Sequence, residues 1–245
     1  MILRGVIPAS GQWRRGAPED HLLALPDHSR AVRILIWRLK TLQSMVVIGL
    51  TGGIGSGKSE AARILEQLGA VVVNADRVGH ATYRSGTSTW HAIVQAFGLE
   101  VVGHDGEIDR RRLGAIVFGD PGRLKRLNEI VWPAIRQALE ARIARERHDD
   151  SSAAIVIEAA VLLEAGWDDL VDEVWVVDAP EPEVQSRLVA RGMSREDVRA
   201  RSQFQLSRDE RNGRAQVLIR NDTDLKGLEV AIRKAWDGRL EKRRR

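Results

Sequence analysis

The chain of 245 residues contains no cysteine, so it has neither a disulfide framework nor a thiolate metal site. This absence agrees with a reducing cytoplasm but does not require one, because many secreted proteins also lack cysteine. No apolar run approaches the roughly 20 residues that a helix needs to cross a bilayer. The rest of the composition, 43% hydrophobic and 29% charged, is typical of a globular protein. We therefore expect a cytoplasmic protein without a membrane partner.

The basic character of the chain lies at its two ends. The sequence pI is about 9.8. Residues 1–44 carry a net charge of +4 and residues 239–245 another +4, and since the whole chain is +4, residues 45–238 carry −4. Basic tails can contact nucleic acid or membrane phosphates, so a nucleic-acid binder acting through them is one alternative. The prediction that we favour is solvated ends and no specific nucleic-acid partner.

Residues 1–44 differ in pattern from the rest of the chain. They hold scattered proline, glycine and arginine, and they show helical periodicity only at 30–42. Acidic residues interrupt any secretory signal or mitochondrial presequence. We expect this N-terminal extension to be disordered, or to precede a natural start at Met45. The predicted organisation is then a folded domain over 45–240 and a basic tail over 241–245.

From Met45 onward, short apolar runs alternate with segments of helical periodicity. The runs are typical of strands that are buried on both faces. Their alternation with helices predicts an α/β fold with a parallel sheet flanked by helices. We expect strands at 45–50, 70–73, 153–157, 174–177 and 216–220. We expect helices at 59–68, 75–83, 87–97, 110–118, 121–147, 183–191, 195–205 and 225–240.

A phosphate-binding loop (P-loop) follows the first expected strand. Residues 52–59 read Gly-Gly-Ile-Gly-Ser-Gly-Lys-Ser and fit G-x-x-x-x-G-K-[ST]. The glycines let main-chain N–H groups point at phosphate oxygens, Lys58 places a cation near the β and γ phosphates, and Ser59 can ligate Mg²⁺. A dinucleotide-binding loop is the closest alternative, but it does not call for the Lys-Ser pair. The expected ATP contacts are Gly53, Gly55, Ser56, Gly57, Lys58, Ser59 and Glu60.

Three acidic residues fall where expected strands end, the edge at which parallel α/β sheets bind ligands. Asp76 could accept the proton of an acceptor hydroxyl or help to hold Mg²⁺, and it could also cap the following helix. Glu158 is placed like the acid that reaches the metal in P-loop enzymes, with a plain surface acid as an equal alternative. Ser59 and Glu158 are therefore the predicted metal residues. Asp178, just before Ala-Pro, is expected to be a turn residue.

Arginines crowd the stretch from residue 187 to residue 214. Acids are interspersed, so most of these arginines are expected to form solvated ion pairs on helix faces. Small-molecule kinases need arginines that close over the triphosphate and neutralise charge in the transition state. We expect one or two of the set to do so, although spacing alone does not select them. The set is Arg187, Arg191, Arg195, Arg199, Arg201, Arg208, Arg211 and Arg214.

Several motifs together resemble the dephospho-coenzyme A kinase family. The resemblance runs from Met45 to about Trp236. Its most specific part is the string Leu-Thr-Gly-Gly-Ile-Gly-Ser-Gly-Lys-Ser that ends at Ser59. The other matching segments are Asn74–Asp76, Asp109–Leu113 with Val117-Phe118, Leu162–Glu164, Arg187-Leu188, Arg191–Arg195 and Gln205–Arg208.

The resemblance implies a P-loop kinase domain over 45–240, with a helical substrate-side insertion at about 80–147 and a small lid at about 187–208. It implies ATP-dependent phosphorylation of the ribose 3′-hydroxyl of dephospho-coenzyme A with Mg²⁺, the final step of coenzyme A biosynthesis. On the matching positions it implies catalytic roles for Asp76, Lys58 and Arg187. It also implies ATP contacts by Arg191 and Arg208, and substrate contacts by Asp76, Arg110 and Arg111.

The chain departs from the family pattern at several positions. The family commonly has Asp-Ala-Asp where Asn74 opens the triplet and His-Pro where Trp132-Pro133 stands. It often has Asp-x-Pro-Leu-Leu where the segment from Glu158 stands, and Thr where Glu60 sits. The P-loop pair and the candidate base are retained, so we expect the chemistry to be intact. The change at Trp132 bears on substrate contacts.

Other functions remain open at this point. The chain could be another P-loop kinase with a nucleoside-like acceptor, or a non-catalytic module that binds ATP. A GTPase is less favoured, because the sequence contains no Asn-Lys-x-Asp motif for guanine.

Overall fold

The structure is a computed structural model that describes residues 45–149, 154–190, 192–193 and 204–244. The N-terminal extension, including the helix expected at 30–42, lies outside these ranges, as does most of the helix expected at 195–205. The strands are β1 (Val46–Gly52), β2 (Val71–Asn74), β3 (Ala154–Glu158), β4 (Glu173–Asp178) and β5 (Val217–Arg220). The helices are α2 (Lys58–Gln67), α3 (Ala75–Thr82), α4 (Ser88–Phe97), η2 (Leu99–Val101), α5 (Arg110–Val117), α6 (Pro121–Asp149), η3 (Trp167–Leu170), α7 (Glu181–Ala190), α9 (Arg208–Gly213) and α10 (Leu225–Arg244).

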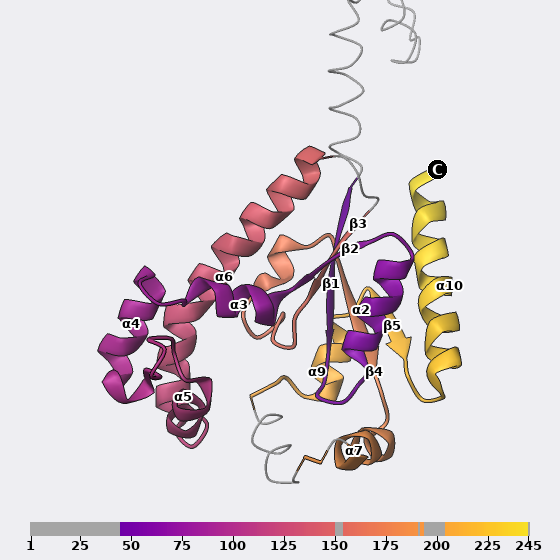
Figure 1. The fold of residues 1–245 in the computed structure, drawn as a ribbon. Coiled ribbons are helices and arrows are strands. Elements are labelled where there is room, and N and C mark those ends of the chain that lie inside the picture. Colours follow the sequence, from indigo (N-terminus) through magenta and orange to yellow (C-terminus); the bar gives the residue numbers. More distant parts are fainter. Residues whose placement is uncertain (1–44, 150–153, 191, 194–203, 245) are drawn as a thin grey trace, which may run out of the picture. The chain divides into compact units, whose positions relative to one another are not determined.

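All five strands form one parallel sheet, in the order β2-β3-β1-β4-β5 (Figure 1). The predicted α/β fold is therefore confirmed. The register aligns Glu158 of β3 with Leu50 of β1 on one side and with Asn74 of β2 on the other. The carboxyl ends of these three strands thus meet at one edge of the sheet, which is where the sequence placed the candidate site.

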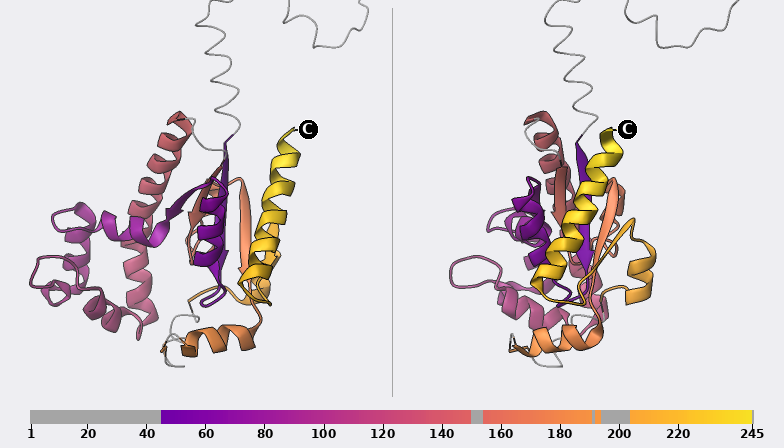
Figure 2. Two further views of the ribbon diagram at one scale, coloured as in Figure 1. Left: turned by 45° about the vertical axis from the view of Figure 1, so that its right-hand side comes forward. Right: turned by 90° about the vertical axis from the view of Figure 1, so that its right-hand side faces the viewer.

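Both faces of the sheet are buried, because successive residues of a strand point to opposite sides. On one face, Val47 of β1 belongs to a core that includes Leu139 of α6. On the other face, Ile48 packs in a core with Ile64 of α2 and Ile232 of α10. Figures 1 and 2 show this arrangement, with α6 on one side of the sheet and α2 and α10 next to each other on the other side. Burial on both faces explains why the strands read as nearly continuous apolar runs.

The chain between β2 and β3 is helical, and side-chain caps define where its helices begin. Asn74 accepts from the N–H of Arg77 at the start of α3, and Thr87 caps α4. Asp109 accepts from two N–H groups of α5. These caps account for helix starts close to the predicted ones, since short polar side chains are strongly preferred there.

The longest element, α6, has 29 residues and carries Pro133 in its interior. Proline has no N–H, so the carbonyl of Glu129 lacks its usual helical donor. α6 packs against α3, α4 and α5 and supplies a wall of the cavity described below. Within the described residues, no helix has both the length and the apolar character needed to span a bilayer.

We predict that Leu139→Ala lowers the free energy of unfolding by about 2–5 kcal/mol. Leu139 is 0% exposed, so its truncation removes apolar contacts and leaves a cavity between α6 and the sheet. The control Leu99→Ala, at a site that is 74% exposed, should change that energy by less than about 0.5 kcal/mol. Urea unfolding followed by circular dichroism measures both values. Equal effects would contradict the placement of Leu139 in the core.

Candidate active site

The P-loop joins β1 to α2 and has the backbone that its glycines permit. Gly55 and Gly57 have φ values of 74° and 96°, in the left-handed region. A Cβ on Gly57 would also overlap Nδ2 of Asn221, so a side chain is excluded there on two grounds. Gly57 is the N-cap of α2, and the N–H groups of Lys58 and Ser59 precede the first hydrogen bond to its carbonyl, which Glu60 makes. The loop therefore presents main-chain donors at a helix N-terminus, an arrangement that binds anions.

Two side chains hold the P-loop through the carbonyl of Ser56. Asn221, which is buried, donates from Nδ2 to this oxygen at 2.7 Å, and Arg187 donates from Nη1 at 3.5 Å. Arg187 also donates from Nη2 to both oxygens of Asn221, at 3.2 and 3.3 Å. The resemblance assigned Arg187 to the triphosphate. The structure places its guanidinium against the backbone of the loop, and Arg187 does not line the main cavity.

The carboxylate of Glu158 gathers three side chains at the edge of the sheet. Its Oε1 accepts from Nζ of Lys58 at 3.0 Å and from Oγ of Ser59 at 2.7 Å. Its Oε2 accepts from Nδ2 of Asn74 at 2.8 Å. Glu158 is only 5% exposed, so the alternative of a plain surface acid is wrong. The structure brings together both predicted metal residues.

Glu158 is ionised despite its burial. Burial raises the pKa of Glu158, but the charge of Lys58 and the hydrogen bonds from Ser59, Lys58 and Asn74 together outweigh burial. The pKa of this carboxyl therefore lies below its ordinary value. An ionised carboxylate next to a hydroxyl oxygen is a hard oxygen donor set, the kind that Mg²⁺ prefers.

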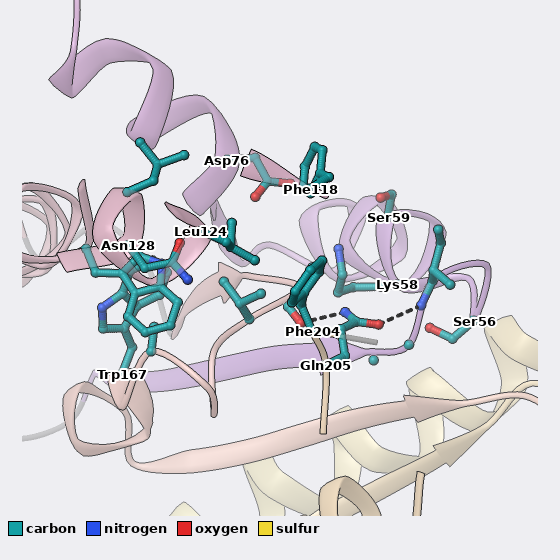
Figure 3. Close-up of a pocket in the computed structure, with 18 of the residues that line it drawn as sticks. Ser56, Lys58, Ser59, Asp76, Phe118, Leu124, Asn128, Trp167, Phe204 and Gln205 are labelled. Carbon is teal, nitrogen blue, oxygen red and sulfur yellow. Dashed lines mark hydrogen bonds between the residues drawn. The ribbon is translucent and has the colours of Figure 1, made fainter. Parts of the chain in front are cut away.

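Asp76 lies in the first turn of α3, is exposed, and lines the main cavity. Figure 3 shows Asp76 among the residues that line this cavity, with the side chain of Phe118 drawn beside it in this view. The alternative of Asp76 as a helix cap is wrong, because the N-cap of α3 is Asn74. Asp76 is therefore free of that structural task and accessible to a ligand.

Asp178 was expected in a turn, but it is the last residue of β4 and is buried. Its two oxygens accept from Nε and Nη2 of Arg208, each at 2.6 Å. The hydrogen bond from Arg208 holds the pKa of Asp178 below its ordinary value, although burial acts in the opposite direction. Arg208 borders a second cavity of about 280 Å³ together with Gly53 and Ile54. The predicted ATP contact Arg208 thus lies next to the P-loop.

The main cavity has a volume of about 1320 Å³ and extends from the P-loop to α6 (Figure 3). One end consists of the P-loop, residues 52–60, and the opposite wall is largely apolar. The apolar lining includes Phe118, Leu124, Trp132, Val161, Trp167 and Phe204. Polar side chains that line it away from the P-loop are Asp76, Lys125, Asn128, Glu129 and Arg136. One cavity therefore joins an anion-binding loop to a largely apolar surface.

Of the other arginines singled out in the sequence, Arg211 also borders the second cavity, whereas the predicted substrate contacts Arg110 and Arg111 lie away from both cavities. Arg110 contacts the ring of His80, with Nη1 2.9 Å from Nε2, and burial and then the charge of Arg110 lower the pKa of His80. Neither Arg110 nor Arg111 lines either cavity described above. Arg191 lies outside the described residues.

Glu60, the last predicted ATP contact of the P-loop, accepts from Arg63 on the surface of α2, and this hydrogen bond lowers the pKa of Glu60.

Sequence reasoning did not identify two residues that hold the P-loop. Asn221 is separated from Ser56 by 165 residues, and Gln205 is separated from its P-loop partner Ile54 by 151 residues. No spacing rule connects such distant positions. The only signal was that Gln205 opens one of the segments that match the family.

Comparisons with known proteins identify the family. The sequence profile described as "Dephospho-CoA kinase" matches residues 46–227. A dephospho-CoA kinase from Geobacter sulfurreducens is 44% identical over 197 residues, which cover 80% of this chain and 100% of that protein. One from Dehalococcoides mccartyi is 42% identical over 199 residues, with 80% and 99% covered.

The fold also matches a solved structure. A crystal structure of a Thermus thermophilus protein is 33% identical and superimposes with a TM-score of 0.67, covering 79% of this chain and 97% of that one. The profile match extends over well more than half of the chain, and both curated relatives are covered nearly end to end. This chain therefore belongs to the dephospho-CoA kinase family, and it is a kinase that uses ATP.

Proposed function

We propose that this protein transfers the γ-phosphoryl group of ATP to the ribose 3′-hydroxyl of dephospho-coenzyme A, the final step of coenzyme A biosynthesis. The observation that carries the proposal is the single cavity of about 1320 Å³, with the P-loop at one end, an apolar wall at the other and Asp76 on its lining. The family supplies the identity of the two substrates. The cavity explains how one site could hold both.

ATP is assigned to the P-loop end. Main-chain N–H groups of the loop and the N-terminus of α2 would receive the phosphates, with Lys58 as the mobile cation. Lys58 is held by Glu158 at 3.0 Å in the structure. Its four-carbon stem would let it turn toward the β and γ phosphates. The arginines that we assign to the triphosphate are Arg187, which bonds the loop at Ser56, together with Arg208 and with Arg191 from the proposed lid at about 187–208.

The residues present fit Mg²⁺. Oγ of Ser59 and the ionised Glu158 lie within 2.7 Å of each other, and Ser59 lines the cavity. Ser59 would hold the ion directly and Glu158 directly or through water, because Mg²⁺ keeps several waters and takes few protein ligands. When bound, the ion would neutralise charge on the β and γ phosphates.

Asp76 is assigned as the base that orients and deprotonates the acceptor hydroxyl. It is exposed to the cavity and has no capping role. The acceptor is assigned to the substrate-side helical insertion at about 80–147, where α6 provides Leu124 and Trp132 as an apolar wall. The enzyme would act by positioning and electrostatics rather than through a covalent intermediate. A cytoplasmic location stays a prediction from the sequence.

The proposal is tested by incubating the full chain with Mg-ATP and dephospho-coenzyme A. We expect ADP and coenzyme A to form in equal amounts, as measured by coupled spectrophotometry and by mass spectrometry of the nucleotide product. A nucleoside or another hydroxyl acceptor used in preference would indicate a different small-molecule kinase. Binding of ATP without acceptor-dependent turnover would indicate a non-catalytic module and contradict the proposal.

Asp76→Asn should lower kcat by about 10²- to 10⁴-fold, because the amide cannot accept the proton of the acceptor hydroxyl. The dissociation constant of Mg-ATP, measured by calorimetry, should change far less, since Asp76 is not part of the P-loop. The matched control is Asp237→Asn, at an exposed site on α10. If the first variant lost ATP affinity as strongly as turnover, Asp76 would instead have a structural or metal-binding role.

Glu158→Gln should alter how stability depends on pH. The folded-state pKa of Glu158 lies below the ordinary value of 4.5. Its ionisation therefore stabilises the folded protein above that pH, and the contribution is lost as pH falls through the lowered pKa. The difference in unfolding free energy between wild type and variant should thus be largest at neutral pH and shrink in acid. Urea unfolding across the acid range measures it, with the exposed Glu66→Gln as control. A difference independent of pH would contradict an ionised Glu158.

A further inference from the structure

The side-chain amide of Gln205 connects two loops that line the main cavity. Its Oε1 accepts from the main-chain N–H of Ile54 in the P-loop at 3.2 Å. Its Nε2 donates to the carbonyl of Ala160, two residues after the end of β3, at 2.9 Å. Figure 3 shows both bonds as dashed lines. Ile54, Ala160 and Gln205 all line the cavity.

The chemistry of the two partners determines which side chain can make this bridge. A main-chain N–H only donates and a carbonyl only accepts, so the residue between them needs one acceptor and one donor on the same planar group. A glutamine amide has both. An ionised glutamate could still accept from Ile54, but it would face the carbonyl of Ala160 without a donor. It would also add a negative charge to a cavity that we assign to phosphates.

Hydrogen bonds hold the backbone next to Gln205, so the point from which its side chain extends is fixed. The N–H of Leu206 donates to Oε1 of Glu164 at 2.7 Å. The carbonyl of Leu206 accepts from Nη1 of Arg211, which is buried, at 3.0 Å. Ser207 then caps α9 through a capping box with Glu210. A side chain that extends from such a supported segment has limited rotamer freedom. It can therefore fix the position of the two loops to which it is bonded.

We propose that Gln205 is a positioning residue for phosphoryl transfer. By tying Ile54 to Ala160, it sets the separation between the loop that holds the ATP phosphates and the wall that continues through Val161 toward the acceptor. The inference rests on the proposed function. In-line transfer depends steeply on the distance between the two reacting groups, and a displacement of about 1 Å can cost about 10²-fold in rate.

The principal test is Gln205→Met, which keeps the length and approximate volume of the side chain and removes both hydrogen bonds. We expect kcat with Mg-ATP and dephospho-coenzyme A to fall about 10- to 100-fold. The dissociation constant of Mg-ATP should change by less than about threefold, since the ground-state contacts of the phosphates are retained. Initial rates and calorimetry give the two values. A loss of ATP affinity equal to the loss of kcat would overturn the positioning role.

Gln205→Glu provides a second, independent variant. It retains the acceptor for Ile54 but lacks the donor for Ala160, and it adds a charge. We expect it to lose turnover, and also to bind Mg-ATP more weakly than Gln205→Met does. Full turnover in this variant would show that the bond to Ala160 has no role in positioning and would overturn the inference. If Gln205→Met does not fold, this variant and the shorter Gln205→Asn take its place, with loss of kcat expected in both.

The matched control is Gln216→Met. Gln216 is also a bridging glutamine, since Oε1 accepts from the N–H of Val174 at 2.6 Å and Nε2 donates to the carbonyl of Arg214 at 3.4 Å. It directly precedes β5, its partner Val174 lies near the start of β4, and it lines neither cavity. Its loss should lower the melting temperature while leaving kcat within about twofold. Equal losses of kcat in the two methionine variants would reduce Gln205 to a structural role. A wild-type protein without turnover would instead refute the proposed function.

Discussion

The carboxylate of Glu158 is the point on which the rest of the site depends. It ends β3, the strand between β1 and β2, and it binds the lysine and the serine of the P-loop as well as Asn74 at the end of β2. One charged group thus ties the ends of three strands together. Removing one partner of a buried ion pair costs about 3–5 kcal/mol, because an uncompensated charge remains. The group that would help to hold a metal is therefore also the group that fixes where Lys58 and Ser59 lie before any ligand binds.

Two departures from the family pattern meet at this point. Asn74 stands where the family commonly has aspartate, and Glu158 stands where it often has a shorter acid. In the structure, the amide of Asn74 donates to Glu158 at 2.8 Å while its oxygen caps α3. An aspartate at position 74 would place two carboxylates at hydrogen-bonding distance, and like charges so close disfavour ionisation of one of them. Glu158, the longer acid, and the neutral Asn74 form a compatible pair. Both departures from the family pattern are therefore consistent with an ionised Glu158.

The sequence predicted what local patterns encode. Buried runs gave the parallel sheet, and the P-loop motif located Lys58 and Ser59, because their roles depend on neighbours within a few residues. The prediction for Asp178 was wrong. This residue was expected in a turn, but it is the buried end of β4, and its partner Arg208 lies 30 residues away along the chain. Sequence reasoning also missed Asn221 and Gln205, since their contacts with the P-loop arise only when the chain folds. The capping of α3 by Asn74 rather than Asp76 is a difference of two residues in where the helix begins, and helix boundaries are the least predictable feature of a helix.

Both neutral and charged side chains support the P-loop. The side chains that bond its main chain include two neutral amides, Asn221 at Ser56 and Gln205 at Ile54. The two buried carboxylates nearby, Glu158 and Asp178, are each matched by a cation. The N–H groups of the loop, the N-terminus of α2 and the guanidinium of Arg187 next to Ser56 all favour an anion at the loop. If Mg²⁺ binds with the nucleotide, Ser59 and Glu158 would hold it, and its charge would add to the positive potential at the phosphates.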